Sequence, residues 1–286
     1  VIGNGVFGLV VSELLGLKSY KKYALYFIIQ RILMVVLAIS LYHIIGFNGI
    51  IIGIDLSYFA TFLQVYHVFK DRPKIDFSII KSHIQFLFTS YVLDITRTFA
   101  TTIDKIIIAP MLGFALLGNY QIGIQVLAVL LILPGVLYSY TVPHDASGNT
   151  NKKLKMVGVL FSIALVIPTI FLSPILIPIL LPEFTESITV IQLISISLIP
   201  ITISALYISK FLGQERIKIV LIGSGMFITI QIITILILGE IYSVNGVAIA
   251  YLIATTLEAI YLFAVDRWGS NNNSKLMNKK EGGNNN

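Results

Sequence analysis

The sequence predicts an all-α integral membrane protein, a polytopic bundle of hydrophobic helices. First, 56% of its 286 residues are hydrophobic and only 12% are charged, with a mean hydropathy of +0.90. Soluble domains average about 45–50% apolar and about 25% charged residues. Second, the apolar residues are gathered into eight stretches, each near the length of about 20 residues that crosses a bilayer as a helix. Third, the basic residues lie almost entirely in alternate connections between these stretches.

The eight stretches define the expected membrane helices. In chain order they cover residues 23–45, 48–68, 84–109, 117–142, 156–181, 187–209, 217–238 and 244–265. Before them, residues 1–11 read as the last turns of a ninth helix. Because the chain begins at Val1 rather than at Met, we expect it to be the C-terminal fragment of a longer protein.

The connections alternate in charge. All but three of the 20 Lys and Arg residues fall in five segments. These contain Lys18, Lys21 and Lys22; Lys70, Arg72, Lys74 and Lys81; Lys152, Lys153 and Lys155; Lys210, Arg216 and Lys218; and Arg267, Lys275, Lys279 and Lys280. The four intervening turns, which begin at Gly46, Pro110, Pro182 and Gly239, contain none. By the positive-inside rule, the sequence predicts a multi-pass protein of the cytoplasmic membrane with a cytoplasmic C-terminus.

The charge and the remaining composition exclude several classes of site. The net charge of +6 resides mostly in these segments, so it predicts contact with anionic membrane lipids rather than with nucleic acid. The chain has no cysteine, and its four histidines lack metal-ligand spacing. We therefore expect no metal site and no cofactor. After Trp268 the sequence becomes polar and of low complexity, which predicts a disordered tail.

Two pairs of segments match at one offset, which predicts an internal repeat. Gly16 and Gly213 end similar Ser-initiated motifs 197 residues apart, and the Asn-Gly pairs at Asn48 and Asn245 have the same separation. Six crossings lie between matched points, so the two copies have the same orientation, and a substrate path is expected between them. The predicted domains are the end of an N-terminal lobe (1–69), a cytoplasmic linker (70–83), a six-helix C-terminal lobe (84–266) and the cytoplasmic tail (267–286).

Several motifs carry a resemblance to a known family. They are "GLKSYKKYALYFIIQRIL", "TTIDKIIIAPMLGFALLGNYQIGIQVLAVLLILPGVLYSYTVPH", "ILLPEFTESITVIQLISISLIP" and "FLGQERIKIVLIG". The chain resembles the polysaccharide transporter and Wzx-type flippase branch of the multidrug/oligosaccharidyl-lipid/polysaccharide exporter superfamily, from about Gly3 to Asp266. The resemblance implies a two-lobe, MATE- and flippase-like fold whose second six-helix lobe is complete and whose first is truncated. It also implies alternating-access translocation of a lipid-linked oligosaccharide.

Polar residues in the helix expected at 84–109 share one face. At about 100° per residue, they occupy a sector about 120° wide. The sector contains Ser90, Asp94, Arg97, Thr98, Thr101, Asp104 and Lys105. Ionisable groups inside a membrane usually face a bundle interior or a water-filled space, so this face is a candidate lining of a substrate cavity.

Within this face, Arg97 is the candidate ligand for a lipid phosphate, because its guanidinium can donate two parallel hydrogen bonds. Asp94, Thr101 and Lys105 are further cavity candidates, and so is Arg31, about 13 Å into its own helix. Alternatives remain open for each. Asp94 and Arg97 could neutralise each other at i and i+3, and Lys105 could extend toward the outer headgroups.

Three carboxylates are candidates for coupling transport to H⁺ or Na⁺. Asp55 and Glu258 are each the lone acid of an expected helix, and Asp104 belongs to the pattern that carries the resemblance. A buried carboxylate with a raised pKa suits proton coupling. A structural role, as a paired acid, remains open for all three.

The sequence leaves three functions to weigh. The favoured one is a flippase for polyprenyl-linked glycan precursors, which would make lipid-linked glycan and membrane lipids its partners. A cation-coupled multidrug antiporter of the same fold would favour acidic over basic cavity residues, whereas the polar face holds two of each. A membrane-embedded glycan polymerase or ligase would need a large external loop with catalytic groups, and every predicted external turn is short. We therefore expect no enzyme activity and no catalytic residues.

Overall fold

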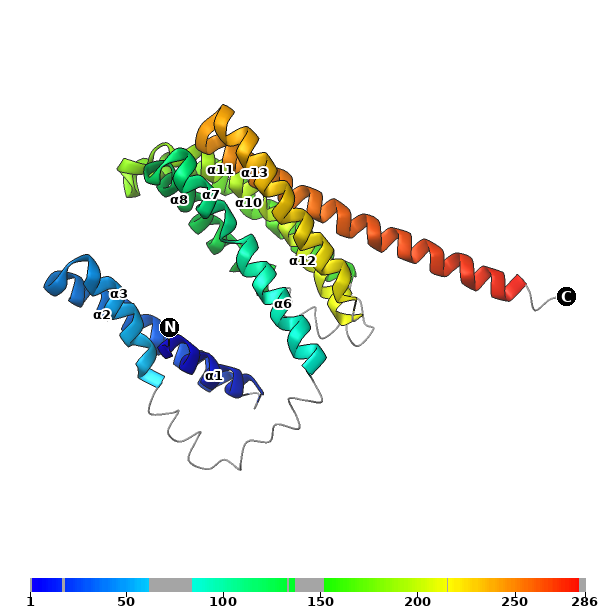
Figure 1. Cartoon of the computed structure of the whole chain (residues 1–286), viewed down its shortest axis with the longest axis horizontal. Helices are drawn as coiled ribbons and strands as arrows, with labels where there is room; N and C mark the ends of the chain where they lie inside the picture. The colour runs from blue at the N-terminus through cyan, green and yellow to red at the C-terminus, as the bar shows by residue number, and fades with distance from the viewer. Residues whose placement is uncertain are drawn as a thin grey trace, which may run out of the picture. The chain divides into compact units, whose positions relative to one another are not determined.

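A computed structural model of the chain describes residues 2–16, 19–61, 84–132, 134–136, 152–214 and 216–282 (Figure 1). Every regular element in these ranges is a helix. The chain divides into two compact units, Val1–Ser82 and His83–Asn286, and the division falls at the end of the segment predicted to be a linker. Among the described residues, four helical segments are long and apolar enough to cross a membrane: Lys21–Ile45, Lys155–Leu180, Ser187–Gly213 and Ile217–Trp268. The predicted all-α membrane fold is confirmed.

The first unit is built around a tight helical hairpin. Its elements are α1 (Ile2–Gly16), α2 (Tyr20–Ile45), α3 (Phe47–Ser57) and the short 3-10 helix η1 (Tyr58–Thr61). The chain reverses at Gly46, whose φ of 68° favours glycine. Gly49 then lies so close to α2 that a Cβ atom there would collide with the backbone of Leu41. Residues 62–68, the end of the second expected helix, lie outside the described residues.

The second unit contains the larger helix bundle. Its elements are α6 (Ile84–Ala100), α7 (Ile103–Leu112), α8 (Phe114–Leu130), α10 (Lys152–Leu180), the 3-10 helix η2 (Pro182–Phe184), α11 (Ser187–Ile196), α12 (Leu198–Gly213) and α13 (Ile217–Gly282). Helix α11 packs against α8, α10 and α13, and its Val190, Ile191 and Ile194 are almost completely buried. The core therefore centres on α11. Many large apolar side chains remain exposed on α10, as expected for a surface that faces lipid.

The helix expected at 84–109 is interrupted, so the prediction of one continuous helix was wrong there. α6 ends at Ala100 and α7 begins at Ile103. The Thr101 hydroxyl donates to the carbonyl of Thr98 at 3.1 Å, and Thr102 has a φ of −122°. Threonine side chains bond readily to nearby backbone and so compete with helical hydrogen bonds, which accounts for a break in a threonine-rich segment.

The helix expected at 187–209 continues as one span, Ser187–Gly213, with a local irregularity in its hydrogen bonding. α11 ends at Ile196 and α12 begins at Leu198, with Ser197 between them. Pro200 lies in the first turn of α12 and has no N–H to donate to the carbonyl four residues earlier. The loss of that bond accounts for the irregularity at Ser197, whose backbone keeps helical angles, with φ −63° and ψ −17°.

The last two expected helices meet at a sharp turn inside α13. Ser243, with φ 55° and ψ −138°, separates them. Beyond them, α13 continues as a helix to Gly282, whereas the composition predicts a disordered tail. The difference is understandable because residues 267–282 contain no proline and helical hydrogen bonds are local, so a helix can continue without tertiary contacts.

The hairpins of the two units share one geometry, as the predicted repeat requires at these positions. Gly46 has φ 68° and ψ −146°, and Ser243, 197 residues later, has φ 55° and ψ −138°. The close approach of Gly49 to Leu41 recurs as the approach of Gly246 to Leu238 at the same offset. The preceding helices α1 and α12 end at Gly16 and Gly213, again 197 residues apart.

Candidate functional site

The break between α6 and α7 presents polar groups at the surface of the second unit. Thr101 is exposed and Lys105 is half-buried. The Lys105 ammonium donates a hydrogen bond to the backbone carbonyl of Thr101 at 2.7 Å, at the point where the helix is interrupted. Asp94 and Arg97 belong to α6, but their side chains lie outside the described part of the structure.

Asp104 does not share this exposed face. Its side chain is only 2% exposed and accepts hydrogen bonds from the Tyr120 hydroxyl at 2.7 Å and from the Lys105 backbone N–H at 2.8 Å. The sector calculation assumed a constant 100° per residue, and the break at 101–102 interrupts that rotation. Asp104 therefore points into the bundle, where it ties α7 to α8.

Tyr120 is the second member of this buried polar contact. Tyr120 of α8 is fully buried, and its hydroxyl joins α8 to α7 through Asp104. Tyr251 of α13 packs against the same apolar core. Sequence reasoning singled out Asp104 and Tyr120 as parts of one motif, but it did not predict the bond between them.

Glu258 lies beside a pocket of about 350 Å³ between the end of α8, α12 and α13. Ser204 lines the same pocket, is 4% exposed, and its hydroxyl has no hydrogen-bond partner among the described residues. A buried hydroxyl without a partner carries a free-energy cost unless something else binds it. Sequence reasoning missed Ser204, because one serine in an apolar helix gives no signal of its own.

Arg31 and Asp55 belong to the first unit. Arg31 is exposed on α2, where its guanidinium lies 3.8 Å from the Met34 sulfur. Asp55 is exposed on α3. A buried polar contact does occur in this unit, where the Gln30 amide donates to the Ser57 hydroxyl at 3.0 Å. Neither of the two charged candidates takes part in it.

The two ends of the second unit differ in charge. At one end, the Lys- and Arg-free turns meet: the Asn119 amide donates to Glu186 at 3.0 Å, and Gly239 lies against Met111. At the other end, Lys210 of α12 pairs with Asp266 of α13 at 2.6 Å. The sequence's alternation of charge therefore corresponds to opposite ends of one bundle. Within the described residues, no group of three His, Asp or Glu side chains is placed to hold a metal ion.

The fold is similar to those of solved membrane transporters. The lipid II flippase MurJ, in an inward closed conformation, matches with a TM-score of 0.71 and 16% identity, over 87% of this chain and 58% of MurJ. A point mutant of a MATE protein matches with a TM-score of 0.66 and 16% identity, over 96% of this chain and 67% of that protein. A multidrug resistance MATE family transporter in an outward-facing conformation matches with a TM-score of 0.64 and 16% identity, over 90% of this chain and 63% of that one.

At 16% identity these likenesses establish the fold, and the chain spans only 58% of the length of MurJ. No curated protein sequence matches the chain. The family described as "Polysaccharide biosynthesis protein" matches residues 4–153, which is more than half of the 286 residues. The chain therefore belongs to the polysaccharide biosynthesis protein family.

Proposed function

We propose that the protein moves a polyprenyl-linked oligosaccharide or polysaccharide precursor across the cell membrane by alternating access. One combined observation supports this proposal. The chain belongs to a polysaccharide biosynthesis family, and its fold is similar to that of a lipid II flippase. The protein would act as a transporter rather than as an enzyme. Its C-terminus would be cytoplasmic, because the lysine-rich end of the second unit would face the cytoplasm.

The substrate path would use the polar surface at the break between α6 and α7. Thr101 and Lys105 are accessible there, and we propose that Arg97 and Asp94 of α6 extend the polar surface along the same helix. Arg31 of the first unit is exposed and remains a cavity candidate from the sequence. A lipid phosphate would bind to the Arg97 guanidinium because its planar fork matches the phosphate oxygens.

Glu258 is the favoured carboxylate for coupling to H⁺ or Na⁺. It lines a pocket together with the Ser204 hydroxyl, which has no hydrogen-bond partner among the described residues, so a hard cation in the pocket would have oxygen atoms in its lining. Asp104 is the weaker candidate, because both of its oxygens already accept hydrogen bonds within the core. Asp55 remains a candidate from the sequence alone.

A cation-coupled multidrug antiporter is the second candidate function. The observation in its favour is that the match to a MATE structure covers 96% of this chain, more than the 87% covered by the match to MurJ. The two functions differ in cargo. A flippase moves a lipid whose sugar headgroup changes sides, whereas an antiporter exports a soluble cationic compound.

The test is transport in vesicles that contain the purified protein. We expect a fluorescent polyprenyl-diphosphate oligosaccharide to become accessible to a headgroup-modifying enzyme on the opposite side, faster than in vesicles without protein. Export of cationic dyes without lipid translocation would overturn the proposal in favour of the antiporter. We expect Glu258→Gln to lower translocation driven by an imposed ion gradient at least tenfold, while Glu240→Gln, an exposed acid on the same helix, leaves it unchanged.

A further inference from the structure

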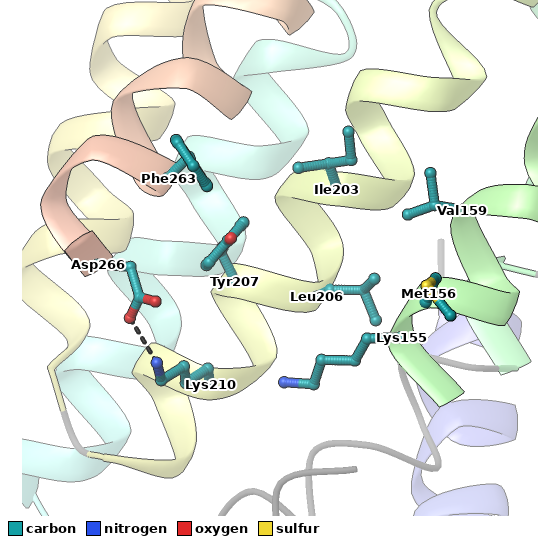
Figure 2. Close-up of a pocket in the computed structure, with 9 residues that line it drawn as sticks. All are labelled: Lys155, Met156, Val159, Ile203, Leu206, Tyr207, Lys210, Phe263 and Asp266. Atoms are coloured by element: carbon teal, nitrogen blue, oxygen red, sulfur yellow. Dashed lines mark hydrogen bonds and ion pairs between the residues drawn. The ribbon is translucent and has the colours of Figure 1, made fainter. Parts of the chain in front are cut away.

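A second pocket, of about 430 Å³, lies between α10, α12 and α13 at the lysine-rich end of the second unit (Figure 2). None of its described lining residues belongs to the pocket beside Glu258. Lys210 of α12 and Asp266 of α13 line it and form an ion pair at 2.6 Å. Lys155 of α10 lies across the pocket from them (Figure 2), and it interacts with another residue of the chain. An ion pair between two helices therefore borders a cavity at the end of an otherwise apolar bundle.

Aromatic side chains join the same two helices next to the ion pair. Tyr207 lies three residues before Lys210 in α12, and Phe263 lies three residues before Asp266 in α13. The two rings meet edge to face with their centroids 6.0 Å apart, and both line the pocket. The ring contact and the ion pair together hold α12 against α13, so the pocket lies between this joined pair and α10.

The ion pair leaves hydrogen-bonding capacity on both of its members. A lysine ammonium has three N–H donors, and a carboxylate has two acceptor oxygens. The bond joins Lys210 Nζ to Asp266 Oδ1, and the described residues provide no further hydrogen-bond partner for the ammonium and none for Oδ2. Both side chains remain partly accessible, at 27% and 21% exposure. A ligand in the pocket can therefore offer an anionic oxygen to the ammonium and an N–H donor to the carboxylate.

The rest of the lining is mostly apolar and reaches the outside of the bundle. Met156 is 61% exposed and Phe263 is 44% exposed, and both line the pocket together with Val159, Ile203 and Leu206. In a membrane-spanning bundle, such exposed apolar side chains contact lipid chains. A ligand that carries an anion and an N–H-bearing cation at one end, and hydrocarbon at the other, would satisfy both parts of the lining.

We propose that this pocket binds the headgroup of a zwitterionic phospholipid with a primary ammonium group, phosphatidylethanolamine, from the leaflet at the lysine-rich end. The phosphate accepts a hydrogen bond from the Lys210 ammonium, and the primary ammonium donates one to Asp266 Oδ2. Phosphatidylcholine carries the same two charges, but its quaternary ammonium has no N–H to donate. Phosphatidylglycerol has no cation for the carboxylate. The site lies within one unit and does not depend on which substrate the protein transports, so it stands apart from the proposed function.

The chain contains its own probe for this site. Trp268 is the only tryptophan of the 286 residues, is 74% exposed, and lies two residues beyond Asp266. Brominated acyl chains quench tryptophan fluorescence on contact. In vesicles that mix phosphatidylethanolamine with phosphatidylcholine, with either lipid brominated in turn, the quenching of Trp268 reports which lipid lies beside it. Both lipids have no net charge, so the general attraction of the lysine-rich end for anions does not separate them.

We expect the quenching of Trp268 to show a preference of about fivefold for phosphatidylethanolamine over phosphatidylcholine, as expected for one partly exposed ion pair. In the native protein, the N-methyl and N,N-dimethyl forms of the lipid should give intermediate values, because each methyl group removes one N–H donor. Asp266→Asn should remove most of the preference, since its neutral amide no longer attracts the ammonium. Glu240→Gln is the matched control, because it makes the same change at an exposed acid of α13 outside the lining.

Three outcomes would overturn the proposal. Equal quenching by the two lipids, or an unchanged preference in Asp266→Asn, would mean that the carboxylate does not recognise the ammonium. Phosphatidylglycerol could quench Trp268 as strongly as phosphatidylethanolamine does, which would indicate a site for anionic headgroups. Soluble phosphoethanolamine, added at the concentration of the lipid, could abolish the preference, which would assign the pocket to a soluble zwitterion.

Discussion

At the scale of single residues, the hydrogen bond between the Tyr120 hydroxyl and the Asp104 carboxylate is a buried polar contact between two helices of the second unit. Both side chains are buried, and the carboxylate has two donors, the Tyr120 hydroxyl at 2.7 Å and the Lys105 N–H at 2.8 Å. A buried carboxylate that loses a hydrogen-bond donor still carries the free-energy cost of its removal from water. The bond therefore stabilises the packing of α7 on α8.

We expect Tyr120→Phe to lower the free energy of unfolding by about 1–3 kcal/mol, since the substitution removes one donor to a buried carboxylate and changes the volume little. Denaturant titration in mixed micelles, followed by circular dichroism, measures the effect. Tyr242→Phe is the control, because Tyr242 is 57% exposed. Equal stability of the Tyr120→Phe variant and the native protein would mean that the bond contributes nothing.

At the scale of elements, the helical hairpins depend on glycine. In α13 the two arms meet at Ser243, and Gly246 lies so close that a Cβ atom there would collide with the carbonyl group of Leu238. The first unit has the same contact between Gly49 and Leu41. Backbone atoms cannot move aside as the end of a flexible side chain can, so both hairpins should tolerate only glycine at these positions.

We expect Gly246→Ala to lower the free energy of unfolding by at least about 2 kcal/mol, several-fold more than an ordinary substitution in a helix. The reason is that the hairpin must open to admit the methyl group. Gly225→Ala, in the same helix, is the matched control. A Cβ atom at Gly225 meets no atom within 4 Å, so that change should be neutral or stabilising by up to about 1 kcal/mol. Thermal unfolding of both variants in the same detergent measures the two effects. Similar losses of stability in Gly246→Ala and Gly225→Ala would contradict the close approach of Gly246 to Leu238.

At the scale of the whole molecule, the two units share one hairpin geometry, which the proposed two-lobe transporter would require. Lysines gather at one end of the second unit and are absent from the turns at the other end, so the two ends of the bundle differ in charge. The break between α6 and α7 presents the accessible polar residues Thr101 and Lys105 beside α6, which itself carries Asp94 and Arg97. If these groups line a substrate path, they must be reachable from water in at least one state of the transport cycle.

Because the chain has no cysteine, single cysteines can be introduced directly at positions 94, 97, 101 and 105. We expect a membrane-impermeant thiol reagent to label them and polyprenyl-linked glycan to protect them. Ile106→Cys is the control, because this exposed apolar residue of α7 should face lipid and resist labelling. Four inert positions would assign the polar face to helix packing instead of transport.

Much of the architecture could be predicted from the sequence. Hydrophobic length and basic connections predicted the helices and the two charged ends, and the offset of 197 residues predicted the shared hairpin. These features depend on local composition, which each segment carries by itself. The break at Thr101–Thr102 was not predicted, because the helical period of about 100° per residue was extended across threonines whose side chains compete for backbone hydrogen bonds.

The sequence by itself determined that this is a multi-pass helical membrane protein with a repeated hairpin and charge-marked ends, because the bilayer imposes those patterns on every span. Only the tertiary structure decided which polar residues meet. Asp104 and Tyr120 lie 16 residues apart, and Lys210 and Asp266 lie 56 apart, on different helices. Their contacts depend on how the helices pack and rotate against one another, and no local pattern encodes that.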